Sequence, residues 1–111
     1  RKDIDLAEVG AEYSYQELLW SEGLGFCGRG EGGRLIDSGV TALDGALPIN
    51  PSGGMLAGNP TNVGGLVRVA EAVLQLQGRA GGRQVANART ALAHSAGGPC
   101  GQQHCVLVLH Q

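Results

Sequence analysis

The apolar positions of the chain predict three strands. Over residues 4–9, apolar side chains are interleaved with acidic ones, which is typical of a short strand. Residues 91–94 form a second short apolar stretch, and residues 105–109 form a continuous apolar run near the C-terminus. A continuous run is typical of a strand buried on both faces, so we expect the last strand to lie inside the protein.

Two other stretches have the spacing of helices. The first is expected to begin at Ser14, because Glu17 follows it at the spacing of a capping box, and to end at Gly23 and Gly25. The second covers residues 63–77, where apolar residues recur every three or four positions. The face expected to pack on the sheet consists of Val63, Leu66, Val67, Ala70, Val73 and Leu74.

Stretches rich in glycine, serine and proline predict the connections. Residues 28–45 are expected to form a long loop and residues 50–60 a second one, with a short extended piece at 47–49. Residues 79–89 are a polar connection, and residues 96–101 are a glycine-rich turn before the last strand. The order strand, helix, loop, helix, strand, strand predicts a layered α/β fold in which helices pack on a mixed sheet.

Composition limits the classes of protein that remain. A chain of 111 residues is one domain or a piece of one, and 42% hydrophobic residues are enough to form a core. The net charge of −2 gives no basic field to attract nucleic acid, and no apolar run approaches the roughly 20 residues that span a bilayer. The chain begins at Arg1 without a methionine, so an earlier leader is compatible with the sequence.

The three cysteines point to a reducing compartment and to no metal. Cys27, Cys100 and Cys105 are odd in number and form no CxxC pair, so we expect no disulfide framework and a cytoplasmic protein. Cys100, His104 and Cys105 are the one conceivable zinc set. Their spacing matches no common structural zinc pattern, which favours plain packing for all three.

Three loops follow strands or precede helices, which is where α/β folds place their sites. They cover residues 10–13, 50–60 and 94–100. The second loop is rich in glycine and leads into a helix, so its backbone N–H groups are suited to hold an anion or a developing oxyanion. Gly53 and Gly54 are therefore candidates for close approach of a ligand to the backbone.

Several segments resemble the thiolase superfamily in their amino-acid sequences and in their order along the chain. They are ELLWSEGLGFC at residues 17–27, GEGG at 30–33, LPINPSGG at 47–54 and VAEAV at 69–73. The resemblance covers nearly the whole chain, and it is closest to the sterol-carrier and lipid-transfer branch, with acetyl-CoA acetyltransferase-like proteins. Its most specific element is the Asn-x-Ser-Gly-Gly…Gly-x-Pro loop.

The resemblance implies a five-layered α/β/α/β/α fold made of two similar halves. Residues 1–111 then form a partial C-terminal domain, beginning after the first strand and helix of the second half. It also implies that the three loops, at residues 10–13, 58–60 and 94–98, converge on one pocket. The family's nucleophilic cysteine belongs to the N-terminal half, which this chain does not contain.

The family's catalytic residues are replaced at each position that can be matched. Working thiolases have Gly-His-Pro in the second loop, where this chain has Asn59, which donates a hydrogen bond but takes no proton near neutral pH. In the first loop, Gly10 stands where the family has a leading Asn or His. In the last loop, Ala96 aligns with the second catalytic cysteine, and Gly97 and Gly98 follow it.

The remaining candidates each have a plainer interpretation. His94 follows a strand beside the last loop and is a candidate base, with a hydrogen-bonded structural histidine as the favoured alternative. Cys100 needs a shifted loop to replace the missing cysteine, and an inert thiol is favoured. Tyr13 is expected in the core rather than in catalysis. The candidate catalytic residues are thus Asn59, His94 and Cys100, and the candidate CoA-binding residues are Gly53, Gly54, Gly97 and Gly98.

Three functions are compatible with this pattern. The first is an acyl-CoA-binding domain of acyltransferase type with degenerate motifs, acting in lipid or steroid metabolism with a CoA thioester as substrate or ligand and no bound cofactor. The second is a retro-aldol lyase subunit for steroid side-chain CoA esters, with an OB-fold partner. The third is a non-catalytic subunit. All three imply further protein, either the missing N-terminal half or a homologous subunit, and a homo-oligomer is expected.

Overall fold

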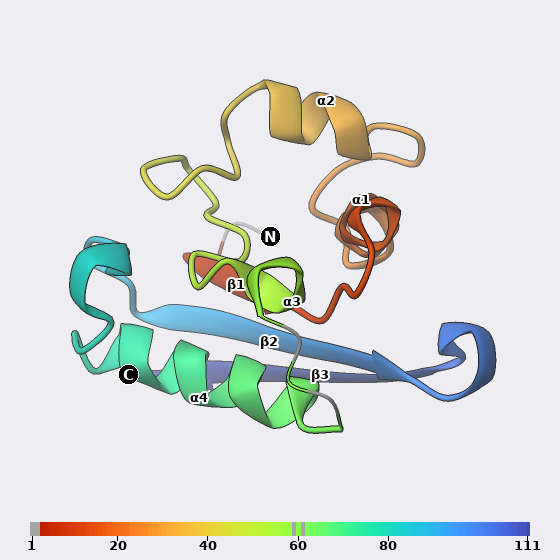
Figure 1. Ribbon diagram of the computed structural model, residues 1–111. Helices are drawn as coiled ribbons and strands as arrows, with labels where there is room; N and C mark the ends of the chain where they lie inside the picture. Colours follow the sequence, from red (N-terminus) through yellow and green to blue (C-terminus); the bar gives the residue numbers. More distant parts are fainter. Residues whose placement is uncertain (1–2, 59, 61) are drawn as a thin grey trace.

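A three-stranded sheet with helices on both faces organises the chain in this computed structural model, which describes residues 3–58, 60 and 62–111 (Figure 1). The strands are β1 (Leu6–Val9), β2 (Thr90–Gly97) and β3 (Gln103–His110). The helices are α1 (Ser14–Gly23), α2 (Gly32–Asp37), α3 (Gly54–Ala57) and α4 (Gly64–Leu76). Two short 3-10 turns, η1 (Gly81–Arg83) and η2 (Pro99–Gly101), lie in the connections. Among these helices none is long and apolar enough to cross a membrane.

The sheet is mixed, with strand order β1-β2-β3. β1 runs parallel to β2, and β2 runs antiparallel to β3. On the other side of β1, Ile49 makes a single parallel bridge to Ala7. Figure 1 shows α4 against one face of the sheet, and α1 and α2 over the other. The predicted α/β class, and the prediction that the three strands share one sheet, are both confirmed.

β1 supplies side chains to a core on each face of the sheet. Leu6 belongs to the core beneath α4, and Ala7 and Val9 belong to the core beneath α1 and α2. Phe26, the only phenylalanine, anchors the second core and is almost fully buried. Burial of each large apolar side chain stabilises the folded state by about 1.5–3 kcal/mol. The two cores therefore hold the helices against the two faces of the sheet.

Helix α1 begins where it was expected, but its cap is different. Tyr13 is the N-cap residue, and Oε1 of Gln16 accepts the N–H groups of Tyr13 at 3.1 Å and Glu12 at 2.8 Å. The predicted capping box of Ser14 and Glu17 is wrong by one residue. Tyr13 is also 58% exposed rather than in the core, because it turns outward and stacks on Tyr15 at 5.9 Å.

The expected long loop at residues 28–45 contains a helix, α2, so that prediction is wrong. Two glycines at the start of α2 argue against a helix by propensity, and its six residues are too few to give an apolar period. Tertiary contacts decide instead. Leu35 packs into the core, and the N–H of Gly32 donates to Oε1 of Glu22 at 3.0 Å. The one-turn helix α3 in the second expected loop was missed for the same reason.

Helix α4 has close to the predicted bounds, but the predicted packing face is wrong. Leu66 is 70% exposed and Val63 is 48% exposed. None of the six expected residues is buried, whereas Arg68, Glu71, Ala72, Gln75 and Leu76 are. The buried side of α4 combines Ala72 and Leu76 with polar residues, which find hydrogen-bond and ion-pair partners there. Apolar periodicity therefore identified the opposite side, which this chain leaves open.

Strand β3 is also more exposed than predicted. Val106, Leu107 and Val108 are 45%, 45% and 60% exposed. β3 is an edge strand within the described part of the chain, paired with β2 alone. A continuous apolar run indicates burial between two neighbouring strands and two covering layers. The run is present here, but residues 3–58, 60 and 62–111 supply a neighbouring strand on one edge only.

Two leucines on α4 test the corrected packing face. We expect Leu76→Ala to lower the free energy of unfolding by about 2–5 kcal/mol, because Leu76 is 8% exposed and its removal leaves a cavity. Leu66→Ser, on the open side, should change it by less than about 0.5 kcal/mol. Urea unfolding followed by circular dichroism measures both. Equal destabilisation by the two variants would show that the outer face carries the fold.

Candidate functional site

A buried carboxylate joins β1 to the glycine-rich loop and to α4. Glu8 is completely buried, and its Oε1 accepts the N–H of Ser52 at 3.1 Å. Its Oε2 accepts the hydroxyl of Ser52 at 2.7 Å and Nη1 of Arg68 at 2.9 Å. Arg68 is 2% exposed, and its Nη1 also donates to the Ser52 hydroxyl at 3.2 Å. We call Glu8, Ser52 and Arg68 the buried polar cluster.

Burial dominates the electrostatics of this cluster. It raises the pKa of the Glu8 carboxyl, and the hydrogen bonds from Ser52 and the charge of Arg68 counter this rise only in part. The negative charge of Glu71 adds to the rise. Glu71 is itself held by a two-point ion pair with Arg83, at 2.6 and 2.9 Å. A chain of charged groups thus leads from the surface at η1 towards the loop.

Asn50 fixes the start of the loop. Its Oδ1 accepts the N–H of Val9 at 2.7 Å, and its Nδ2 donates to Oε2 of Glu17 at 2.7 Å. Asn50 has a φ of 52°, a left-handed conformation that asparagine tolerates better than most residues. Gly54 has a φ of +61°, and a Cβ there would lie 3.0 Å from the Asn50 side chain. The packing of this loop therefore explains the Asn and the second Gly of the Asn-x-Ser-Gly-Gly motif.

The two candidate glycines of the loop already use their N–H groups. The N–H of Gly53 donates to the carbonyl of Asn50 at 2.8 Å, and that of Gly54 donates to the hydroxyl of Ser52 at 3.1 Å. Gly54 is buried and Gly53 is exposed. A ligand can approach the backbone at Gly53, but an anion has to compete with the loop's own acceptors. Their role in CoA binding stays a prediction.

The first and third loops meet at the ends of β1 and β2. The N–H of Gly10 donates to the carbonyl of His94 at 2.9 Å. A Cβ at Gly10 would lie 3.0 Å from that oxygen and 3.2 Å from Cα of Ser95. The backbone of β2 therefore occupies the space that a side chain at position 10 needs.

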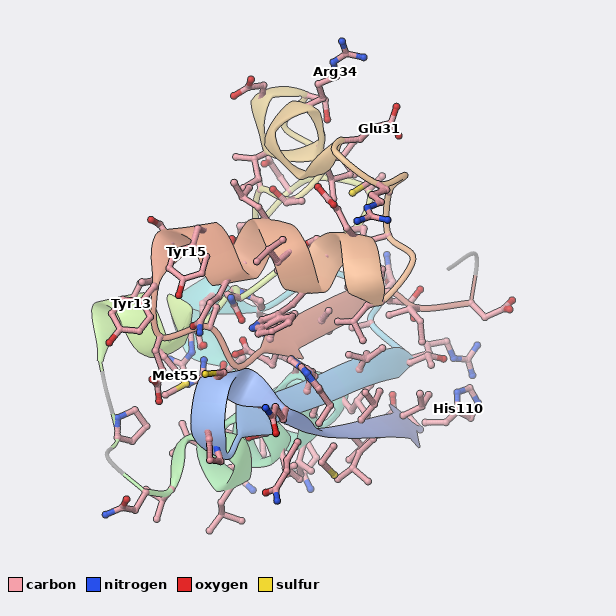
Figure 2. All side chains as sticks on the ribbon, turned by 90° about the vertical axis from the view of Figure 1, so that its right-hand side faces the viewer. Tyr13, Tyr15, Glu31, Arg34, Met55 and His110 are labelled. Carbon is pink, nitrogen blue, oxygen red and sulfur yellow. The ribbon has the colours of Figure 1, made fainter. Side chains whose placement is uncertain are left out.

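The start of α4 lies between these loops. A Cβ at Gly64 would lie 2.9 Å from Cε of Met55, and one at Gly65 would lie 2.7 Å from Oγ of Ser95. Figure 2 shows Met55 on the same side of the molecule as Tyr13, at the beginning of α1. These contacts agree with the expected convergence as far as the described residues go. Asn59 lies outside the described residues, so its place in the site stays a prediction.

His94 points towards α1. It is 2% exposed, and its Nε2 lies 3.0 Å from Nδ1 of His104. The Trp20 ring packs on both imidazoles, with centroid distances of 5.9 Å to His94 and 4.7 Å to His104. Burial and the neighbouring His104 lower the pKa of His94 to about 4. A base of that pKa takes protons poorly at neutral pH, and this geometry favours the structural alternative for His94.

A cavity of about 290 Å³ opens beside this group of rings. It lies between the second half of α1 and the β2–β3 sheet, and it is mainly apolar. The lining residues are Trp20, Gly23, Leu24, His94, His104 and Val106. His104 had been considered only as a zinc ligand, so neither its contact with His94 nor this cavity was anticipated.

Cys100 lies at the turn between β2 and β3. It is exposed and has a φ of 57°, and Gly97 and Gly98 beside it are exposed too. The conceivable zinc set does not assemble: among the residues that the structure describes, no three His, Cys, Asp or Glu side chains could hold a metal. His104 and Cys105 are neighbours in β3, so their side chains project from opposite faces of the sheet.

The buried polar cluster was not predicted, although the sequence carries a signal for it. Glu8 stands in an apolar strand and Arg68 in an apolar helix. Charged residues at such positions are buried only when they are paired, so their joint presence indicates a contact between the two elements. Ser52 gives no such signal, because serine is common in exposed loops.

The chain is an α/β domain with a mixed sheet, helices on both faces and glycine-rich loops at the strand ends. The whole chain, residues 1–111, matches the family model described as thiolase C-terminal domain-like. It is 47% identical over 100 residues to an acetyl-CoA acetyltransferase of Methanothermobacter thermautotrophicus, covering 89% of this chain and 26% of that protein. It is 46% identical over 96 residues to sterol carrier protein 2 of Oryctolagus cuniculus, covering 86% of this chain and 18% of that protein.

A solved structure agrees with this relationship. The Ltp2-ChsH2(DUF35) aldolase matches with a TM-score of 0.82 at 29% identity, over 98% of this chain and 27% of the aldolase chain. The chain therefore belongs to the thiolase C-terminal domain-like family, and the predicted resemblance and fold are confirmed. It spans about a quarter or less of the length of these relatives.

The buried imidazole makes a prediction about acid stability. The pKa of His94 falls from 6.5 to about 4 in the folded state, so the unfolded chain takes up this proton first as the pH falls. The folded state keeps its full stability with respect to this group above pH 6.5, where His94 is neutral in both the folded and the unfolded chain. Stability is lost as the pH falls from 6.5 to 4, because only the unfolded chain takes up the proton in that range. We expect that loss to be on the order of 2–3 kcal/mol, and His94→Gln should remove it.

Urea unfolding at pH 7 and at pH 4.5 measures this dependence, with His110→Gln as the matched control. His110 is exposed at the end of β3. A His94→Gln variant with the same acid sensitivity as the parent chain would contradict the assignment.

Proposed function

We propose that this chain is part of a thiolase-type protein that binds a CoA thioester, and that the chain lacks the usual catalytic side chains. Gly10, Asn59 and Ala96 stand where the family resemblance implies an Asn or His, a His and a Cys. The CoA thioester is substrate or ligand rather than a bound cofactor. The names of the relatives, an acetyl-CoA acetyltransferase and a sterol carrier protein, support a role in lipid or steroid acyl-CoA metabolism.

Gly10 is the observation that carries the proposal. With β2 only 3.0 Å from where its Cβ would be, a catalytic side chain at this position requires the backbone of β2 to shift by a few tenths of an ångström. The close approach of β2 therefore favours glycine at this position. Stabilisation of a thioester carbonyl then falls to backbone donors, to Asn59, or to other parts of the protein.

Uncovered apolar surface supports a larger assembly. Val106 and Val108 are exposed on one face of β3, Leu107 is exposed on the other, and Leu66 is exposed on α4. Apolar surface of this kind marks a contact site, and β3 has an edge without a neighbouring strand in the described part of the chain. We propose that the missing N-terminal half, or a homologous subunit, covers these surfaces, and that the complete protein is a homo-oligomer.

The proposed compartment is the cytoplasm. Cys100 and Cys105 are exposed and form no disulfide. Exposed thiols persist where the surroundings are reducing.

A retro-aldol lyase is the second candidate, and the similarity to an aldolase favours it. Retro-aldol cleavage requires a base for a hydroxyl proton and a pocket that stabilises a carbonyl, but no cysteine nucleophile. Such a lyase would act on steroid side-chain CoA esters with an OB-fold partner. A non-catalytic subunit is compatible with the same replacements. A nucleophilic cysteine in the N-terminal half would support thiolysis, and its absence would favour the lyase or the binding role.

We expect the chain by itself to have no thiolase activity. Claisen cleavage by this family requires a thiolate, a base that generates it and an acid that protonates the leaving carbanion. The thiolate lies outside this chain, and the positions of the other two hold Asn59 and Ala96. Loss of one catalytic residue from a set that acts together lowers the rate by several orders of magnitude. The assay supplies acetoacetyl-CoA and free CoA and follows the absorbance of the thioester enolate.

The control is Cys100→Ser, because Cys100 is an exposed thiol that follows Ala96, the expected catalytic position, by four residues. Turnover by the chain that disappears in Cys100→Ser would contradict the proposal and assign the chemistry to Cys100. Titration of acetyl-CoA by calorimetry separates the binding role from a purely structural one, since binding does not require the missing side chains.

A further inference from the structure

Two imidazoles lie side by side on the α1-facing side of the sheet. His94 on β2 is paired with Val106 on β3, and His104 lies two residues before Val106, so the two histidines are diagonal neighbours on one face. Their rings are nearly parallel, with centroids 5.3 Å apart. The nearest nitrogens, Nε2 of His94 and Nδ1 of His104, are separated by 3.0 Å.

This separation suits two ligands of one metal ion. Imidazole nitrogens bind Zn²⁺ and similar ions at about 2.0–2.1 Å, so two nitrogens 3.0 Å apart subtend roughly 95° at the metal. That angle is near the value of square-planar and octahedral coordination, which Ni²⁺ and Cu²⁺ prefer over the tetrahedral geometry of Zn²⁺. His94 is buried, whereas His104 is exposed and lines the cavity together with His94.

A metal binds the neutral form of imidazole. In the neutral pair, one ring carries its hydrogen on the nitrogen that faces the other ring. When a cation binds to both facing nitrogens, that hydrogen moves to the outer nitrogen of the same ring, so each ring keeps one N–H and stays neutral. The pair therefore releases no net proton.

We propose that His94 and His104 form a binding site for a divalent d-block cation at the edge of the α1–β3 cavity. The cavity, of about 290 Å³, leaves room for water to complete the coordination. No acidic residue lines it, and no third ligand stands nearby among the described residues. The site therefore selects borderline ions that prefer imidazole over Mg²⁺ or Ca²⁺, and it holds them exchangeably. The inference does not depend on acyl-CoA binding.

Trp20 makes the proposal directly testable, because it is the only tryptophan and its ring contacts His104. The experiment titrates the full chain with Ni²⁺, a paramagnetic quencher, after alkylation of the cysteines with iodoacetamide. We expect saturable quenching of Trp20 fluorescence with one ion per chain, reversed by Zn²⁺ in excess. Mg²⁺ at the same concentrations should leave the fluorescence unchanged.

Variants of the three histidines supply matched controls. His104→Gln should weaken Ni²⁺ binding at least about tenfold, and it should remain folded because His104 is exposed. His110→Gln should bind like the parent chain, since His110 lies six residues along β3, about 20 Å away, and on the opposite side of the molecule from Tyr13 in Figure 2. His94→Gln should also lose binding, with circular dichroism as the check on folding. Equal quenching of the parent and His104→Gln, loss of quenching in His110→Gln, or no saturation in the parent would overturn the proposal.

Discussion

The ion pair between Glu8 and Arg68 is the constraint on which the rest of the structure depends. It brings a charged strand residue and a charged helix residue together in the interior, where an unpaired charge would be strongly unfavourable. Ser52 completes the pair by bonding to both partners, and this places the glycine-rich loop at the end of β1. The strand, the loop and α4 are thereby fixed relative to one another. The contact of Gly10 with β2 then closes the same end of the sheet.

The same cluster explains how far the sequence predicts the fold. The three strands and the two longer helices follow from the length and spacing of their apolar stretches, which indicate the type of element even where the apolar side chains are exposed, as on β3 and α4. The packing side of α4 does not follow, since Arg68 and Gln75 are buried through hydrogen bonds and ion pairs that periodicity ignores. β3 has the composition of an interior strand, yet Val108 is exposed, because burial depends on neighbours that this chain lacks. Helix α2 depends on Leu35 and on the bond from Gly32 to Glu22, which are tertiary contacts.

The residues of the candidate site stay a prediction, whereas two of its three loops are seen to meet. The loops at residues 10–13 and 94–98 meet, as the family resemblance implied, and Met55 and Ser95 both border the start of α4. The sequence motifs shared with the family indicated that these loops meet, since glycine-rich loops alone are weak signals of a site. The orientation of His94 and its contact with His104 depend on strand register, which no local pattern specifies.

A double-mutant cycle on the buried pair tests the central claim most directly. Glu8→Leu and Arg68→Met are made singly and together, and the free energy of unfolding is measured in urea. Each single variant should lose about 3–5 kcal/mol, because it leaves one buried charge without its partner. The double variant should lose much less than the sum, since no unpaired charge remains. Additive losses would contradict the account, because they would mean that Glu8 and Arg68 stabilise the fold independently of each other.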